Sequence, residues 1–207
     1  MVFDSFISKA RQKLTLPLPG HEAHKKLIHK ERFLFKNSPD SSTRESAVLL
    51  LLYPSSDIVQ IPLILRPMYD GQHGGQMALP GGKKEYTDEN LERTALRETQ
   101  EEIGIKALDI KVIGELTEVF IPVSNFIVKP YVGFIDYKPQ FFPDQKEVDR
   151  IYELEILDFF NDNNLGYKTV TAGGKQIEVP GFEIANSYIW GATALIMNEF
   201  KEAILQA

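Results

Sequence analysis

Three glutamates stand close together in one short segment of the chain: Glu98, Glu101 and Glu102. On a helix, residues three and four positions apart share a face, with Cβ atoms roughly 5–6 Å apart. Like charges at that spacing destabilise a helix, so folding alone does not explain the cluster. Carboxylate oxygens are ligands that Mg²⁺ and Mn²⁺ prefer, so the spacing indicates a divalent-metal site. A solvated acidic face neutralised by Arg93 and Arg97 is the alternative.

A helix over roughly residues 88–103 is expected to carry these glutamates. A turn at 80–82, Pro-Gly-Gly, precedes it and permits close backbone approach. Thr87 or Asp88 would cap its start, because short oxygen-bearing side chains accept hydrogen bonds from the first free amides of a helix. Gly104 suits the position just past its end, where a left-handed conformation is common.

The run over 97–105, Arg-Glu-Thr-Gln-Glu-Glu-Ile-Gly-Ile, resembles the signature of the Nudix hydrolases. That signature reads Arg-Glu, an aliphatic residue, any residue, Glu-Glu, any residue, Gly and an aliphatic residue. In it a Gly, five residues, a Glu and seven residues precede the Arg, whereas Gly82 and Arg97 are 97 − 82 = 15 positions apart, one more than the pattern. Either Asp88 or Glu89 therefore stands for the first acidic residue of the family. Thr99 replaces an aliphatic residue, and its methyl group can still pack.

The resemblance implies the Nudix fold, an α/β (α+β) fold with a mixed β-sheet sandwiched between α-helices. It also implies a hydrolase that depends on Mg²⁺ or Mn²⁺. Glu98, Glu101 and Glu102 would be metal ligands, and the carbonyl of Gly82 would be a further ligand. Glu98 and Glu101 would also serve catalysis, with Arg97 orienting Glu98.

Glu147 is a further catalytic candidate. It follows a polar stretch over 136–146 and precedes Val148. In several Nudix enzymes a loop here supplies an acidic residue as base, and the branch described next often carries Glu-Val at this position. A glutamate at the start of a helix is the alternative, since acidic side chains favour that place.

A second stretch, residues 63–82, resembles the signature of the coenzyme A pyrophosphatase branch of the family. Counted back from Gly82, the residues that agree with it are Gly81, Pro80, Gln76, Gly75, His73, Arg66 and Leu63. Asp70 and Gly71 stand where the branch has Leu-Arg, so a cation that could meet a phosphate of coenzyme A is missing.

This second resemblance implies hydrolysis of coenzyme A or an acyl-coenzyme A to 3′,5′-ADP and a phosphopantetheine. Substrate contacts are expected from Arg66, His73 and Gln76, and from the neighbouring Lys83. Arginine offers a fixed fork that binds phosphate through two hydrogen bonds. The alternatives are a pyrophosphatase acting on ADP-ribose, NADH or another dinucleotide, and a Nudix module that binds nucleotides without turnover.

The sequence divides into an N-terminal helical arm and linker, 1–43, and a Nudix hydrolase domain, 44–207. Apolar residues at helical spacing predict an amphipathic helix over 2–14 that docks on the domain or contacts a second copy of the chain, which leaves a homodimer open. A solvated helix is expected over 22–29, and a polar surface connection over 36–45.

Apolar, β-favouring runs predict the strands, and two of the connections between them read as hairpins. The expected strands are 46–53, 58–65, 110–113, 116–121, 126–134, 167–170, 176–179 and 188–191, followed by a helix over 192–205.

The composition is typical of one soluble domain: 207 residues, 43% hydrophobic and 25% charged. A formal net charge of −6 argues against nonspecific nucleic-acid binding, which needs a basic face. The expected partner is a small-molecule nucleotide, met by metal ions and a few basic side chains.

No cysteine is present, so neither a disulfide nor a thiol nucleophile is available. The longest apolar run, 47–53, is far shorter than the roughly 20 residues that span a bilayer. The first residues lack the pattern of a secretory signal. No membrane association and a cytoplasmic location are therefore expected.

Overall fold

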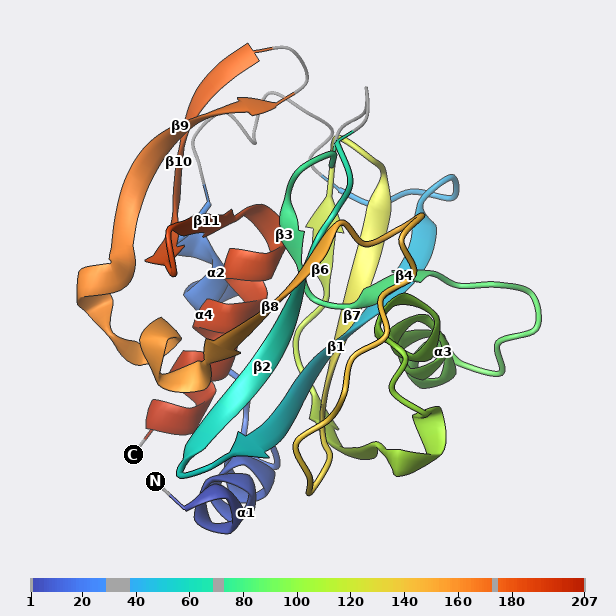
Figure 1. Cartoon of the computed structure of the whole chain (residues 1–207). Coiled ribbons are helices and arrows are strands. Elements are labelled where there is room, and N and C mark those ends of the chain that lie inside the picture. Colours follow the sequence, from blue (N-terminus) through green and yellow to red (C-terminus); the bar gives the residue numbers. More distant parts are fainter. Residues whose placement is uncertain (1, 29–37, 69–72, 173–174, 207) are drawn as a thin grey trace.

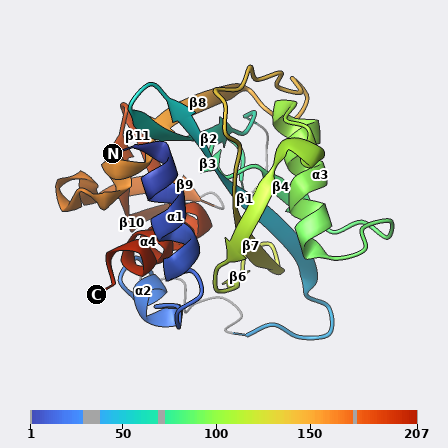
Figure 2. The ribbon, with the colours of Figure 1, turned by 90° about the horizontal axis from the view of Figure 1, so that it is seen from below.

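The computed structural model describes residues 2–28, 38–68, 73–172 and 175–206 (Figure 1). A mixed β-sheet forms its centre. Helix α3 (Leu91–Ile103) covers one face, and helices α1 (Phe3–Lys13) and α4 (Gly191–Leu205) cover the other (Figure 2). The expected α/β architecture, a mixed sheet between helices, is confirmed.

The main sheet runs in the order β3-β2-β1-β7-β5, with β4 paired to β1, β6 to β7 and β8 to β2. β1 pairs in parallel with β7 and antiparallel with β2 and β4. The strands are β1 (Arg44–Ser55), β2 (Ile58–Leu65), β3 (Met77–Ala78), β4 (Gly81–Lys83), β5 (Lys111–Glu115), β6 (Val119–Ile121), β7 (Phe126–Phe134) and β8 (Arg150–Glu155).

β1 is buried on both faces. Leu49 and Leu51 point toward α3, Leu50 and Leu52 point toward α1 and α4, and all four are 0% exposed. A strand covered on both sides needs an unbroken apolar run rather than an alternating one, as the sequence shows here. The hairpin expected between 46–53 and 58–65 is confirmed: β2 has the predicted bounds, and β1 extends two residues beyond the predicted strand at each end.

A second sheet, ordered β11-β10-β9, extends from the side of α4 that faces away from α3 (Figure 1). Its strands are β9 (Leu165–Ala172), β10 (Lys175–Ile184) and β11 (Ser187–Trp190). β9 and β10 confirm the second predicted hairpin, and its turn, 173–174, lies outside the described residues. The last predicted strand ends one residue early, because Gly191 begins α4.

The sequence did not predict three strands: the short β3 and β4 and the six-residue β8. The strand expected over 116–121 begins only at Val119. β3 and β4 contain two and three residues, too few for a periodic pattern. Short 3₁₀ segments connect the larger elements: η2 (Ala107–Asp109), η3 (Ile156–Phe160) and η4 (Asp162–Asn164).

The predicted N-terminal helix is confirmed as α1, and it docks on the domain: Phe6 is 1% exposed, and its ring centroid lies 6.4 Å from that of Phe200 in α4. The solvated helix expected over 22–29 is wrong in two respects. α2 (His21–Lys25) is shorter, and His24 is buried rather than solvated. Residue 29 and the start of the 36–45 connection lie outside the described residues.

A buried ionisable pair fixes α2 against α4. His24 Nε2 lies 2.8 Å from Glu199 Oε2, with both side chains almost fully buried. The backbone N–H of Thr117 donates to the same carboxylate at 3.1 Å. Burial would raise the pKa of Glu199, but the hydrogen bonds from His24 and Thr117 outweigh it and hold the pKa below its usual value. This pair ties segments from both ends of the chain to the sheet.

No helix in the described ranges is long and apolar enough to span a membrane.

Candidate active site

Helix α3 begins later than predicted. Asn90, not Thr87 or Asp88, is its N-cap, and the Asn90 side chain accepts a hydrogen bond from the Arg93 N–H at 2.9 Å. The prediction for its end is confirmed: Gly104 takes a left-handed conformation with φ of 78°.

Asp88 binds Arg97 instead of capping the helix. Its two carboxylate oxygens accept from Arg97 Nε and Nη2, both at 3.0 Å. The hydrogen bonds from Arg97 lower the pKa of Asp88 to about 2. Of the two acidic residues left open by the sequence, Asp88 and Glu89, Asp88 is therefore the one that pairs with Arg97. The additional residue of this chain falls between Asp88 and Arg97.

Arg97 also holds two of the helix glutamates. Its Nη1 donates to Glu98 at 2.9 Å and to Glu101 at 2.8 Å, and its Nη2 donates to the carbonyl of Lys83 at 3.1 Å. A guanidinium with several fixed acceptors loses most of its rotamer freedom. The geometry suits a residue that orients Glu98.

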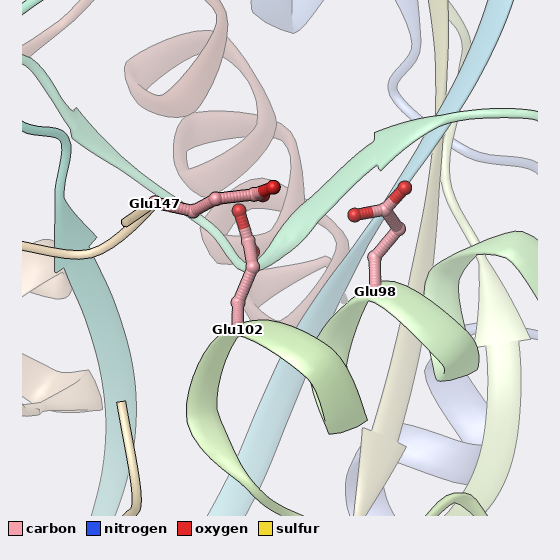
Figure 3. A group of neighbouring side chains, drawn as sticks. All are labelled: Glu98, Glu102 and Glu147. Atoms are coloured by element: carbon pink, nitrogen blue, oxygen red, sulfur yellow. The ribbon is translucent and has the colours of Figure 1, made fainter. Parts of the chain in front are cut away.

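Three carboxylates converge beside α3: those of Glu98, Glu102 and Glu147 (Figure 3). One oxygen from each lies within 4.8 Å of the others. Glu101 stays apart from this group, because its side chain is 58% exposed and accepts from Arg97. The helix therefore contributes two of its three glutamates to the cluster, and a separate segment contributes the third.

Glu102 is the buried member of the cluster. Its side chain is 1% exposed, and Oε2 accepts from the backbone N–H of Gly81 at 2.8 Å. The Nη2 of Arg66 lies 4.0 Å from Oε1. Burial raises the pKa of Glu102 to about 8 despite these two partners, and Glu98 and Glu147 contribute to the rise.

Glu98 is half-buried and lies directly against Gly82. A Cβ added at Gly82 would fall 2.5 Å from the carboxylate carbon of Glu98, so only glycine leaves this carboxylate its place. Burial raises the pKa of Glu98, and the charge of Arg97 partly offsets the rise.

The residues present fit a divalent cation. The carboxyl of Glu102, whose pKa burial raises to about 8, would ionise beside an ion of charge +2. Oxygen-only donors of this kind suit Mg²⁺ or Mn²⁺.

Three of the expected substrate-binding residues lie close together, and one of them, Arg66, lies beside Glu102. Arg66 follows β2 and donates to the carbonyl of Gly81 at 3.4 Å, next to Glu102. His73 Nδ1 lies 3.4 Å from Gln76 Oε1, and burial lowers the pKa of His73. The Arg66 N–H donates to the Gln76 carbonyl at 3.1 Å, so this segment folds back beside Arg66.

Lys83 is exposed at the end of β4, directly after Gly82. Asp70 and Gly71, where this chain departs from the coenzyme A signature, lie outside the described residues.

Glu147 does not begin a helix, so that alternative is wrong. It lies in a turn that leads into β8. The sequence analysis missed Asp144, which starts this turn: its Oδ1 accepts from the Lys146 N–H at 3.0 Å. An aspartate that bonds to the backbone two residues on is a recognised turn signal and could have been found.

Comparison with known proteins identifies relatives of this chain. The NUDIX domain family matches residues 43–164. A human protein named mitochondrial coenzyme A diphosphatase NUDT8 is 31% identical over 161 residues, covering 75% of this chain and 68% of that protein. An uncharacterized Nudix hydrolase NudL from Pectobacterium atrosepticum is 30% identical over 164 residues, covering 78% of this chain and 83% of that protein.

Among solved structures, a MutT/nudix family protein from Enterococcus faecalis aligns with a TM-score of 0.48 at 16% identity, over 89% of this chain and 71% of that one.

The chain belongs to the Nudix family, whose members are hydrolases that act on small nucleotide substrates and generally use divalent metal ions. It is a Nudix hydrolase with a diphosphate-cleaving active site.

The raised pKa of Glu102 predicts how stability varies with pH in chelator. In the unfolded chain this carboxyl ionises above its ordinary pKa of 4.5, whereas in the folded protein it stays protonated up to about pH 8. The folded state therefore binds the extra proton in that window, and the free energy of unfolding falls as pH rises through it. Glu102→Gln removes the titration and keeps an acceptor for Gly81.

We expect the unfolding free energy of the natural protein to fall relative to the Gln variant between about pH 5 and 8.5, by on the order of 2–4 kcal/mol. Urea unfolding in EDTA across this range measures it. Parallel pH profiles for the two proteins would contradict the buried, protonated state of Glu102.

Proposed function

We propose that this Nudix hydrolase cleaves the diphosphate bond of coenzyme A or an acyl-coenzyme A, releasing 3′,5′-ADP and a phosphopantetheine. The observation that supports this choice of substrate is the placement of Arg66 beside Glu102, with His73 and Gln76 folded next to it. These residues match the coenzyme A signature. The human relative named a coenzyme A diphosphatase supports the same substrate.

Glu98 and Glu102 would hold Mg²⁺ or Mn²⁺ together with Glu147 and the carbonyl of Gly82. Such an ion, when bound, neutralises diphosphate charge and lowers the pKa of water. Glu101 is a further ligand only if it leaves Arg97, to which it is bound in this structure. Arg97 fixes the orientation of Glu98 through a hydrogen bond of 2.9 Å, and Asp88 fixes Arg97.

Glu147 would offer one carboxylate oxygen to the ion, and its other oxygen is the proposed proton acceptor. It is exposed, so it can exchange protons with solvent, and its carboxylate lies within 4.8 Å of those of Glu98 and Glu102. In the proposed step a water oxygen forms a bond to phosphorus, its proton passes to Glu147, and the bridging P–O bond breaks to release the second phosphate. General base catalysis of this kind contributes about 10²–10⁴-fold to a rate.

Arg66 and Lys83 are the proposed cations for substrate phosphates. Arg66 Nη2 lies 4.0 Å from Glu102 and 3.4 Å from the Gly81 carbonyl, and the side chain is 30% exposed, so a phosphate can reach its guanidinium. Lys83 is exposed one residue beyond Gly82 and uses only its backbone carbonyl to hold Arg97. A phosphate bound by Arg66 would lie next to the carboxylate cluster.

Replacing Glu102 tests the metal-dependent mechanism. Glu102→Gln keeps the side-chain shape but removes the negative charge that Glu102 would carry beside the ion, so we expect turnover of coenzyme A in Mg²⁺ to fall by at least about 100-fold. Glu92→Gln, on the first turn of the same helix and outside the cluster, is the matched control and should retain turnover. Near-natural rates for Glu102→Gln at saturating Mg²⁺ would contradict the assignment.

The substrate is tested by the 3′-phosphate, which coenzyme A carries and dephospho-coenzyme A, ADP-ribose and NADH lack. We expect kcat/KM to be highest for coenzyme A, with a smaller preference over dephospho-coenzyme A than in family members that keep the second Arg. Gly71→Arg restores that cation and should widen the preference, while Lys83→Ala should narrow it. Competition assays with products identified by mass decide the matter.

Equal kcat/KM for the two coenzyme A forms would show that the 3′-phosphate is not recognised. A dinucleotide pyrophosphatase would then be the better assignment, and binding without hydrolysis of any compound would indicate a non-catalytic module.

A further inference from the structure

Glu147 reaches the carboxylate cluster from outside helix α3. It lies on the segment 141–149, here called the strap, and enters the cluster from a different side than Glu98 and Glu102 (Figure 3). Its position relative to Glu102 therefore depends on how the strap is held against the helix. An exposed side chain on a free loop would not keep a fixed distance from a buried one.

Two backbone hydrogen bonds join the strap to the end of α3. The Phe142 N–H donates to the carbonyl of Ile103 at 3.0 Å, and the Asp144 N–H donates to the carbonyl of Glu102 at 3.1 Å. The last four carbonyls of a helix lack partners within it. The strap thus satisfies two of them, and one belongs to a member of the cluster.

Asp144 transmits this attachment to Glu147. Its carbonyl accepts from the N–H groups of Glu147 at 3.0 Å and Val148 at 2.8 Å, and its side chain accepts from Lys146 at 3.0 Å. Val148 is 1% exposed in the core beneath α3. The turn is therefore fixed at one side to Glu102 and at the other to the core.

Gly104 provides the surface on which the strap lies. A Cβ at this position would fall 2.8 Å from Phe142 Cβ, 3.1 Å from its carbonyl oxygen and 3.2 Å from its nitrogen. Two of these atoms are backbone, so the strap itself would have to move. Gly104 is thus required by contact with the strap as well as by its φ of 78°.

We infer that Gly104 and Asp144 are positioning residues, which hold Glu147 at its place in the carboxylate cluster through the strap. The inference rests on the proposed function, in which Glu147 takes part in the chemistry. It predicts that a side chain at position 104 disables Glu147 while leaving Glu98 and Glu102 in place.

Gly104→Ala tests this, with Gly191→Ala as the matched control. Gly191 also has a positive φ, 64°, but a Cβ there meets nothing within 4 Å. Both variants place a side chain at a positive φ, and only in the first does the added Cβ meet the strap. Asp144→Ala is a second variant, which leaves the helix end intact and removes the acceptor for the Lys146 N–H, so kcat should fall. Asp144→Asn keeps that acceptor and should retain the natural kcat.

The first readout is amide hydrogen exchange, which needs no activity. In Gly104→Ala we expect the Phe142 and Asp144 amides to exchange at least about 10-fold faster, with no such change in Gly191→Ala. The second is Mn²⁺ affinity, which should weaken in Gly104→Ala by the same factor as in Glu147→Gln. The third is kcat, which should fall about 10-fold or more with little change in KM.

A double-mutant cycle separates positioning from general damage to the helix. Once Glu147→Gln is present, adding Gly104→Ala should change kcat and Mn²⁺ affinity by less than about 2-fold, because the group it positions is already lost. Equal effects of Gly104→Ala in both backgrounds would overturn the inference. Protected amides with unchanged Mn²⁺ affinity in Gly104→Ala would also overturn it, as would natural rates and affinity in Glu147→Gln.

The inference and the proposed function can fail separately. If the natural protein hydrolyses no compound of the substrate panel, the proposed function fails, while amide exchange and Mn²⁺ affinity still decide whether the strap positions Glu147.

Discussion

Repulsion among three carboxylates within 4.8 Å of one another is the constraint on which the rest of the site depends. A different feature of the structure offsets this repulsion at each carboxylate. Glu98 is held by Arg97, which Asp88 fixes in turn. Glu102 is buried against the Gly81 N–H, with a pKa of about 8. Glu147 remains exposed to water. Folding without a cation therefore carries a cost that a bound cation would relieve, which is the arrangement expected of a metal site.

The scaffold serves to bring distant segments to this point. β1 lies between α3 on one face and α1 with α4 on the other, and β4 pairs with it so that Gly82 faces Glu98. β8 pairs with β2, and the strap before it crosses the end of α3. Because the core is continuous on both faces of the sheet, the positions of β4, α3 and the strap are set by packing rather than by local sequence.

The sequence predicted those features that local chemistry determines. The end of α3 at Gly104, the buried run of β1 and both hairpins follow from residue type and periodicity. The start of α3 could not be predicted in this way, because Thr87, Asp88 and Asn90 are all residues that cap helices well. In the structure Asp88 pairs with Arg97, and Asn90 is the cap. Helical spacing likewise groups Glu101 with Glu98. The structure instead pairs Glu101 with Arg97 and completes the cluster with Glu147, a long-range contact that no periodicity contains.

The central claim is that the carboxylates of Glu98, Glu102 and Glu147 form a single cation site on this Nudix hydrolase. Anomalous diffraction from crystals soaked in Mn²⁺ tests it most directly. The account predicts a strong anomalous peak bounded by oxygens of these three residues near the Gly82 carbonyl, and its loss in Glu102→Gln crystals. A peak bounded instead by Glu101, or no peak near α3 at saturating Mn²⁺, would contradict it.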